Sequence, residues 1–226
     1  MSRDYNRLCK AIGYTFKDNS YLEEALTHRS ASNKNNERLE FLGDAVLNFV
    51  IASELFRKFP TITEGQLSRL RSSLVKGETL ASLAADLELG EYLYLGVGEL
   101  KSGGHRRASI LADALEAIIG AVYLDGGFEH SQTLILYLLR NLLQKIKPTD
   151  ELKDPKTRLQ EYLQSNKLSL PVYKVSKVEG QAHAQTFRIE CQVPGSEQVT
   201  HGEGSTRRKA EQEAASKALD LLQKSG

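Results

Sequence analysis

The chain has 226 residues, of which 40% are hydrophobic and 26% are charged, and this is ordinary globular composition rather than that of a disordered or fibrous protein. Its formal net charge of +1 does not by itself indicate a nucleic-acid partner. No run reaches the roughly 18 apolar residues of a membrane span, and the first residues lack the apolar core of a secretory signal, so we expect a cytoplasmic protein without a membrane partner.

A segment rich in proline and charge divides the chain. Residues 147–155 (KPTDELKDP) contain two prolines and almost no apolar side chains, which is typical of a linker. We therefore predict a first domain at residues 1–147, a linker at 148–154 and a second domain at 155–226. The net charge is −2 before residue 153 and +3 from there on, a modest hint that the second part meets an anion.

Upstream of the linker, the apolar pattern is typical of helices. Apolar residues recur at intervals of three and four over residues 21–26, 37–59, 64–87, 109–123 and 131–145. Asn36 is a candidate N-cap of the second of these stretches, and Pro60 marks its end. The first domain is therefore predicted to be all-α.

Downstream of the linker, the apolar period changes to two, which is typical of half-buried strands. The clearest strand is FRIECQV at residues 187–193, another begins at residues 173–175, and a short third strand is expected around Val199. Helical patterns over residues 156–164 and 207–223 bracket the strands. The second domain is therefore predicted to be a small α+β domain of order α-β-β-β-α, with a sheet packed on helices.

Acidic residues gather on two helices of the first domain. At about 100° per residue, Glu37, Glu40 and Asp44 fall within an arc of roughly 60° on one helix face. A later helix is apolar almost all round except for Asp113 and Glu116, one turn apart, and is predicted to be mostly buried.

These carboxylates need a positive partner, because burying them is costly unless they are paired or bind a cation. No lysine or arginine lies between residues 108 and 124, so the partner must come from elsewhere. Oxygen ligands without histidine or cysteine suit Mg²⁺ or Mn²⁺, and the isolated Cys9 and Cys191 support neither a thiolate zinc site nor a disulfide framework. Two facing acidic helices can hold a pair of such ions, which in phosphodiester hydrolysis activate water and stabilise the leaving oxygen.

Two other interpretations of the acidic residues remain open at this point. They can be solvated helix-surface charges or members of salt bridges, which is the commonest role of an isolated helical glutamate. A ferritin-like di-iron site is a further possibility, but it calls for Glu-x-x-His pairs, and the sequence contains none.

The segment NERLEFLGD at residues 36–44 resembles the signature of the ribonuclease III family. THRS (27–30), EGQLSRLR (64–71), LGVGE (95–99) with KSGG (101–104), and SILADALEAIIGA (109–121) look like further family blocks in the expected order. The resemblance covers essentially the whole chain, in the short bacterial architecture. It implies an endonuclease that hydrolyses double-stranded RNA with Mg²⁺, or Mn²⁺ as a substitute, and that processes ribosomal precursors and some messenger and transfer transcripts.

The resemblance also implies roles for the matched carboxylates. Glu40, Asp113 and Glu116 match direct metal ligands, and Asp44 matches a residue that supports the attacking water or an ion. Asp44 and Glu116 are accordingly the expected catalytic residues, and Glu116 is the one expected to be indispensable.

A homodimer is a further implication of the resemblance. Glu37 and Glu64 match positions that assist substrate or metal binding in a valley formed by two subunits. One catalytic centre per strand would cut each duplex twice, leaving 5′-phosphate and 3′-hydroxyl ends with short 3′ overhangs. The segment FLG at residues 41–43 can contribute to a subunit interface, although core packing is at least as good an interpretation.

Two features near the acidic helices have competing interpretations. The basic, glycine-bearing loop KSGGHRR at residues 101–107 can hold a phosphate near the ions, or it can be a plain solvent-exposed turn. For His28 a structural role is favoured, because no other ligand pattern surrounds it.

The last helix begins with positive charge. Arg207, Arg208 and Lys209 lie in its first turn, where the helix dipole disfavours cations, and Ser205 or Thr206 can cap it. An anion docked at the helix start would explain this arrangement, while a solvated basic patch is the alternative.

Together with the α-β-β-β-α order, this run resembles the double-stranded RNA-binding domain. In that family the first helix and the loop after the first strand enter successive minor grooves, while the cationic helix start meets the intervening phosphates. The RNA contacts that the resemblance implies are Thr157, Gln160, Glu161, His183, Arg207, Arg208 and Lys209. Where the family often has another lysine this chain has Glu211, which predicts a weaker phosphate contact there and moderate affinity.

Two rival functions belong to other classes. One is a regulator that binds structured RNA without cutting it, and the other is a helical protein that merely dimerises. The presence of all four matched carboxylates, Glu40, Asp44, Asp113 and Glu116, argues against both.

Overall fold

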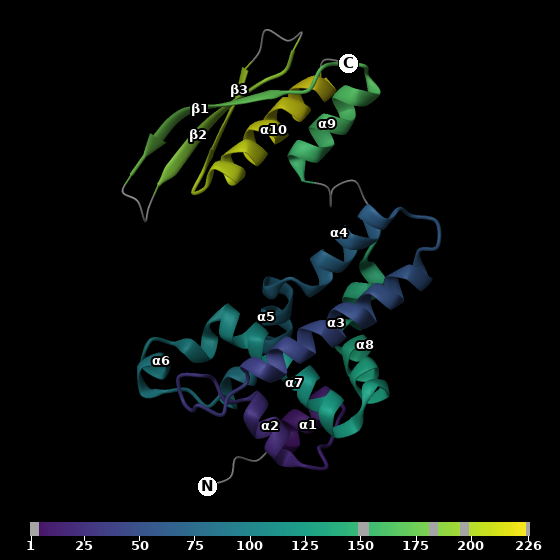
Figure 1. Cartoon of the computed structure of the whole chain (residues 1–226), viewed down its shortest axis with the longest axis vertical. Coiled ribbons are helices and arrows are strands. Elements are labelled where there is room, and N and C mark those ends of the chain that lie inside the picture. Colours follow the sequence, from purple (N-terminus) through teal and green to yellow (C-terminus); the bar gives the residue numbers. More distant parts are fainter. Residues whose placement is uncertain (1–4, 149–153, 181–184, 195–198, 225–226) are drawn as a thin grey trace. The chain divides into compact units, whose positions relative to one another are not determined.

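The computed structural model describes residues 5–148, 154–180, 185–194 and 199–224, and it divides into two compact units, Met1–Pro148 and Thr149–Gly226 (Figure 1). Most of the expected linker lies outside the described residues. Within the described ranges, no helix is both long enough and apolar enough to cross a membrane.

The first unit is helical, which confirms the predicted class. Its elements are α1 (Asn6–Ile12), α2 (Asn19–Ala25), α3 (Glu37–Lys58), α4 (Glu64–Val75), α5 (Gly77–Asp86), η1 (Leu89–Glu91), α6 (Val97–Lys101), η2 (Gly104–Arg106), α7 (Ala108–Gly126) and α8 (Phe128–Lys145). The short α1 and α6 were not predicted, because a helix of five or seven residues carries too little periodicity to stand out.

Helix α7 is the buried centre of the first unit, as its apolar sequence predicted. Its buried side chains include Leu115 and Ile118, and α2, α3, α5 and α8 all pack against it. Burial of this order is the main stabilising contribution to a helical core, at about 25 cal/mol per Å² of apolar surface.

Two glycines let α3 and α7 approach each other closely. A Cβ on Gly43 would lie 1.8 Å from the carbonyl oxygen of Glu116, and one on Gly120 would lie 2.3 Å from that of Leu39. No side chain fits at such distances, so the two helices meet backbone to backbone. The consequence for the site is that the acidic residues of α3 and α7 face each other at short range.

The prediction of a single helical stretch over residues 64–87 is wrong in one respect. The chain forms two helices there, α4 and α5, which are separated at Lys76. The Lys76 backbone is extended, with φ −65° and ψ 146°, and the next residue is Gly77. The hydroxyl of Thr79 donates to the carbonyl oxygen of Ser73, 3.1 Å away, across the break. Both helices bury apolar side chains, among them Leu74 of α4 and Leu80 of α5.

Asn36 occupies the N-cap position of α3 as expected, but its side chain makes no capping hydrogen bond. Its backbone is helical and its side chain is only 2% exposed, so it points into the fold rather than back over the helix start. The side chain of Asn35 accepts from the backbone N–H of Glu37 instead, at 3.0 Å.

The second unit has the predicted order α-β-β-β-α. Its elements are α9 (Pro155–Ser165), β1 (Val172–Glu179), β2 (Thr186–Gln192), β3 (Val199–Gly204) and α10 (Arg207–Lys224). The antiparallel sheet has the order β1-β2-β3, with Tyr173 opposite Cys191 and Cys191 opposite Thr200.

Both helices of the second unit cover one face of the sheet (Figure 1). The core between the two layers contains Leu159 and Leu163 of α9, Cys191 of β2 and several alanines of α10. A Cβ on Gly202 would lie 2.1 Å from the carbonyl oxygen of Ala210, so β3 passes very close to α10. This close packing fixes the start of α10 against the sheet.

Candidate functional site

Three carboxylates from α3 and α7 converge in the first unit. Glu40, Asp113 and Glu116 each offer one oxygen, and these oxygens all lie within 4.8 Å of one another. All three side chains are partly buried. Their convergence follows from the close approach of the two helices at Gly43 and Gly120.

Burial raises the pKa of all three carboxylates of this cluster, and nearby negative charges add to the effect at Glu116 and Glu40. Burial raises the pKa of Glu116 to about 7, and the nearby charges of Asp44, Glu40 and Asp113 add to the effect. Burial followed by the charge of Asp113 raises the pKa of Glu40, with a smaller opposing effect from Arg29. Burial also raises the pKa of Asp113, against the opposing charges of His28 and Arg29.

The donor chemistry of the cluster fits a divalent cation. Its ligand atoms are carboxylate oxygens alone, the set that hard ions such as Mg²⁺ and Mn²⁺ prefer. Burial, the largest cause of the three raised pKa values, disfavours the charged carboxylates, and neighbouring carboxylates add to the effect at Glu116 and Glu40. A bound divalent cation would stabilise the charged forms.

Asp44 lies beside the cluster on α3, one turn beyond Glu40. It is exposed, and its charge contributes to the raised pKa of Glu116. The side-chain amide of Asn48 donates to one carboxylate oxygen of Asp44 at 2.7 Å and to its carbonyl oxygen at 3.0 Å. One oxygen of Asp44 is therefore held in place by the helix itself.

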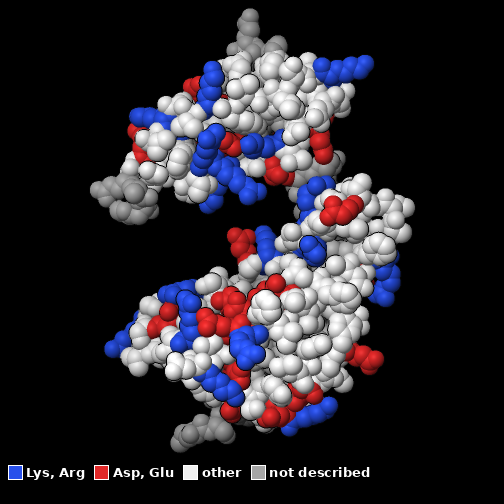
Figure 2. All heavy atoms as spheres, in the orientation of Figure 1, with Lys and Arg blue, Asp and Glu red and all other residues white. Residues whose placement is uncertain are grey.

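A cavity of about 510 Å³ opens next to two of the three clustered carboxylates. Its lining residues are His28, Arg29, Ser30, Asn36, Glu37, Glu40, Glu99, Arg107, Ser109, Ile110 and Asp113. Figure 2 shows acidic side chains gathered on the first unit, with lysine and arginine side chains around them.

Of the two arginines that line this cavity, Arg107 belongs to the basic loop considered for holding a phosphate near the ions, whereas Arg29 was not identified as a site residue from the sequence. Arg29 lies 3.4 Å from Glu37, and Arg107 lies 2.6 Å from Glu99. Both arginines come from segments that resemble family blocks or the basic loop, but no spacing along the chain indicates that they share a cavity with the acidic helices.

Two polar side chains of the cavity wall, His28 and Asn36, differ in their hydrogen bonding. The Nδ1 atom of His28 lies 2.8 Å from the hydroxyl of Ser30, which agrees with the structural role favoured for this histidine. The side-chain nitrogen of Asn36 is buried, and no hydrogen-bond partner for it occurs in the part of the chain that the structure describes.

The remaining residues expected near the site are Glu37 and Glu64, and only Glu37 is found at the cavity. Glu37 is exposed and lines the cavity. Glu64 begins α4, accepts from the hydroxyl of Ser68 at 2.7 Å, and is not among the residues that line the cavity.

In the basic loop, Gly103 has φ +79°, a conformation that favours glycine, and the loop then leads into α7.

In the second unit, the cationic start of α10 is exposed. Arg207, Arg208 and Lys209 all point outward, and the hydroxyl of Thr206 accepts from the backbone N–H of Lys209 at 3.2 Å. Thr206 is therefore the capping residue of the two that the sequence offered.

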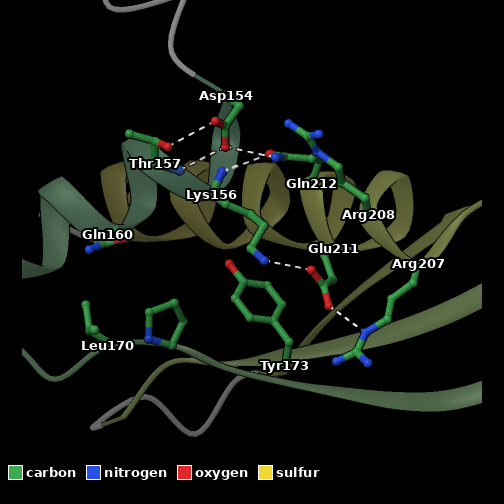
Figure 3. A pocket seen from close by; sticks show the side chains of 11 residues that line it. Asp154, Lys156, Thr157, Gln160, Leu170, Tyr173, Arg207, Arg208, Glu211 and Gln212 are labelled. Atoms are coloured by element: carbon green, nitrogen blue, oxygen red, sulfur yellow. Dashed lines mark hydrogen bonds and ion pairs between the residues drawn. The ribbon is translucent and has the colours of Figure 1, made fainter. Parts of the chain in front are cut away.

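A second cavity, of about 750 Å³, is lined by residues near the starts of α9 and α10 (Figure 3). Thr157 and Gln160 line it from α9, and Arg207 and Arg208 line it from α10, so four of the expected RNA contacts share one surface. Glu161 is exposed on α9. His183 lies outside the described residues, and its expected contact has no structural counterpart here.

Helix α3 also carries exposed phenylalanines that the core does not use. Phe41, Phe49 and Phe56 are 81%, 62% and 72% exposed. Their spacing of eight and seven residues places them on one side of the helix. Core packing, the alternative considered for the segment at residues 41–43, holds for Gly43 but not for Phe41.

Comparisons with known proteins agree with this arrangement of parts. Residues 18–144 match the family model described as ribonuclease-III-like, and residues 155–222 match the double-stranded RNA binding motif. Ribonuclease 3 of Vibrio cholerae is 54% identical over 98% of this chain and 99% of its own length. Ribonuclease 3 of Hahella chejuensis is 58% identical over 98% of both chains.

Solved structures resemble the first unit. The nuclease domain of ribonuclease III from Campylobacter jejuni superposes with a TM-score of 0.62 and 45% identity, covering 65% of this chain and 100% of that one. A second structure of that nuclease domain, described as flexible in a region involved in dimer formation, gives a TM-score of 0.60 and 47% identity, covering 61% and 97%.

Proposed function

Since this chain belongs to the ribonuclease III family, we propose that it hydrolyses both strands of double-stranded RNA at a metal centre formed by Glu40, Asp113 and Glu116. It is an enzyme of that family with a double-stranded RNA-binding domain. The single observation that carries the proposal is the convergence of these three carboxylates within 4.8 Å.

The proposed metal is Mg²⁺, with Mn²⁺ as a substitute, because both accept an all-oxygen ligand set. When bound, such ions lower the pKa of a coordinated water and stabilise charge on the leaving oxygen. Glu40, Asp113 and Glu116 would hold the ions from two helices. Asp44, fixed through one oxygen by Asn48, would use its other oxygen to orient the attacking water.

The proposed substrate contacts lie in both units. Glu37 and Glu64 would assist substrate or metal binding near the metal centre. Thr157, Gln160, Glu161 and His183 would meet the RNA minor groove, and Arg207, Arg208 and Lys209 would meet phosphates. The cavity that Thr157, Gln160, Arg207 and Arg208 share supports the described part of this assignment.

The proposed active form is a homodimer. A row of exposed phenylalanines on α3 is the kind of apolar surface that marks a protein interface, because monomers rarely expose such patches. A related nuclease domain is described as having a region involved in dimer formation. Two centres, one for each strand, would leave 5′-phosphate and 3′-hydroxyl ends with short 3′ overhangs.

The proposed cellular role follows from family likeness. We expect the protein to act in the cytoplasm on precursors of ribosomal RNA and on some messenger and transfer transcripts. The two domains are proposed at residues 1–147 and 155–226, joined by a linker at 148–154, in keeping with the division into two compact units.

The test is incubation of the protein with a long RNA duplex, labelled at the 5′ end of one strand and then of the other, in Mg²⁺. Cuts on the two strands offset to leave a short 3′ overhang, with 5′-phosphate product ends, would support the proposal. Retention of the duplex on a native gel without cleavage would identify a binding protein and overturn it. Parallel reactions with a chelator and with Mn²⁺ test the metal.

A further inference from the structure

Glu211 lies between the starts of the two helices of the second unit (Figure 3). One of its carboxylate oxygens lies 2.6 Å from Nζ of Lys156, near the start of α9, and the other accepts from Nε of Arg207, the first residue of α10, at 2.9 Å. Only 12% of the Glu211 side chain is exposed. The carboxylate therefore joins two cations that come from different helices.

The neighbouring residue of α10 makes a second connection to α9. The side-chain oxygen of Gln212 accepts from the backbone N–H of Lys156 at 3.0 Å, and its nitrogen donates to Asp154 at 2.8 Å. Asp154 caps α9 by accepting from the backbone N–H of Thr157 at 3.1 Å and from its hydroxyl at 3.0 Å. A continuous set of polar contacts thus runs from Thr157 to Arg207.

Lys156 is also held from its other side. Its ammonium lies 4.5 Å from the ring centroid of Tyr173, within the range of a cation–π contact. Since the Tyr173 backbone belongs to β1, the sheet as well as α10 constrains the position of Lys156. The Lys156–Glu211 pair is accordingly a fixed element of the cavity wall, unlike a pair of mobile surface charges.

The charge of Glu211 is largely used within this network. Partial burial raises its pKa, but hydrogen bonds from Lys156 and Arg207 outweigh that effect and lower it. Glu211 is therefore ionised at neutral pH, and both of its oxygens are engaged by cations. It presents little free negative charge to an approaching phosphate, and the moderate affinity expected from a glutamate at this position stays a prediction.

We propose that Glu211 is a positioning residue for RNA binding, which sets the spacing between the α9 contacts and the cation of Arg207. Thr157 and Gln160 on one side of the cavity and Arg207 on the other would then meet the minor groove and the phosphates of one duplex together. The inference rests on the RNA contacts of the proposed function.

Simple electrostatics and a positioning role predict opposite changes in RNA affinity when the charge of Glu211 is removed. Removing a negative charge from an RNA-binding surface should tighten binding. If Glu211 positions Arg207 and Lys156, then Glu211→Gln should weaken binding about threefold to tenfold, because both cations must be ordered when RNA binds. Glu211→Lys should weaken binding further, although it raises the net charge by two units, because the new ammonium repels Lys156 and Arg207.

The experiment measures the dissociation constant of the full-length chain for a fluorescent RNA duplex, by anisotropy, in a chelator that prevents cleavage. Asp220→Asn is the matched control, because it removes one exposed carboxylate farther along the same helix and should not weaken binding. In Mg²⁺, Glu211→Gln should raise KM for the duplex and leave kcat unchanged.

A double-variant cycle separates positioning from a general loss of fold. Arg207→Ala should raise the dissociation constant. Adding Glu211→Gln to Arg207→Ala should raise it little further, because the cation that Glu211 positions is already absent. If the two losses are independent and additive, or if Glu211→Gln binds as tightly as the wild type or more tightly, Glu211 does not position Arg207 and the inference is overturned.

The variant Arg208→Ala distinguishes failure of this inference from failure of the proposed function. Arg208 lines the same cavity but has no part in the Glu211 pairs. If Arg208→Ala weakens binding and Glu211→Gln does not, the RNA surface stands and the positioning role is wrong. If neither variant weakens binding, the proposed RNA surface is itself wrong, and this inference fails with it.

Discussion

The clustered carboxylates of the first unit bring a cost in stability that a bound cation would remove. Burial and mutual repulsion raise the pKa of Glu116 to about 7, so its charged form destabilises the fold above that pH. In a chelator at pH 8 we expect Glu116→Gln to raise the free energy of unfolding by about 1–2 kcal/mol, after allowance for solvent screening of a half-exposed group.

Thermal unfolding with and without Mg²⁺ measures this effect. Mg²⁺ should raise the Tm of the wild type more than that of Glu116→Gln, because the variant lacks one proposed ligand. Glu23→Gln, on the exposed side of α2, is the control and should leave both values unchanged. A Glu116→Gln variant that is less stable than the wild type in the chelator would contradict the account.

The effect of Asp125 on stability should depend on pH in the opposite sense to that of Glu116. Slight burial acts to raise its pKa, but hydrogen bonds from the hydroxyl of Tyr14 and the backbone N–H groups of Lys17 and Asp18 lower it. Because the pKa is lower in the folded state, ionised Asp125 stabilises the fold above its unfolded pKa. That stability is lost as the pH falls through the folded value.

Asp125→Asn should therefore destabilise the protein by about 1–2 kcal/mol near pH 7, the usual effect of losing charged hydrogen bonds. The difference from the wild type should shrink as the pH falls below about 3.9, the usual aspartate value, and through the lower pKa of folded Asp125, because the carboxylate then becomes neutral. Chemical denaturation near pH 7 and at a pH below that folded-state pKa measures this. An equal difference at both would show that charge is not the cause.

The sequence indicated the residues of the proposed metal centre better than those of the cavity around it. Helical periodicity placed Glu37, Glu40 and Asp44 on one face, and an apolar helix made Asp113 and Glu116 conspicuous. The family resemblance then selected Glu40, Asp113 and Glu116 as the expected ligands. Arg29 and Arg107 join them only through tertiary packing, which has no signal in local spacing. The network at Glu211 was likewise invisible, since it joins two helices that are far apart in the chain.

At the scale of the elements, the contact between α3 and α7 decides the geometry of the site. A Cβ on Gly43 would lie 1.8 Å from the carbonyl oxygen of Glu116, so any side chain there must push the helices apart. We expect Gly43→Ala to destabilise the protein by more than about 2 kcal/mol, as overpacked cores do, and to reduce cleavage strongly by separating Glu40 from Glu116.

Gly98→Ala is the matched control for this helix contact, because a Cβ on Gly98 meets nothing within 4 Å. Denaturant unfolding and cleavage rates compare the two variants. If Gly43→Ala is as stable and as active as Gly98→Ala, close approach of the helices does not build the metal centre.

Element types were predictable where the periodic stretches are long, and less so at breaks and short turns. The apolar pattern of α7 and the alternation in β2 each correspond to a single observed element. The break between α4 and α5 was missed, because apolar spacing continues across Lys76 although its backbone is extended. The importance of Gly43 and Gly120 was missed for a related reason, since a close approach depends on which helix lies opposite.

At the scale of the whole molecule, the exposed phenylalanines of α3 predict self-association. Phe41 is the most exposed of them, at 81%. Phe41→Ser should shift the protein from dimer to monomer at micromolar concentration, because it removes a large apolar contact from the proposed interface. Sedimentation equilibrium measures the shift, with Leu100→Ser, an exposed position on α6, as the control.

A wild-type protein that is already monomeric at these concentrations would contradict the proposed dimer, as would a Phe41→Ser variant that remains dimeric. If Phe41→Ser is monomeric, its cleavage of both strands should fall with the dimer population, because each subunit is proposed to supply the centre for one strand.

Cleavage and binding of an RNA duplex by the wild type and Glu116→Gln in Mg²⁺ test the proposed metal centre directly. We expect the variant to bind the duplex with nearly unchanged affinity and to cleave it more than about a hundredfold more slowly, since even residues that only support a metal ligand commonly cost tenfold to a hundredfold. Cleavage by Glu116→Gln at the wild-type rate would contradict the claim that Glu40, Asp113 and Glu116 form the catalytic metal centre.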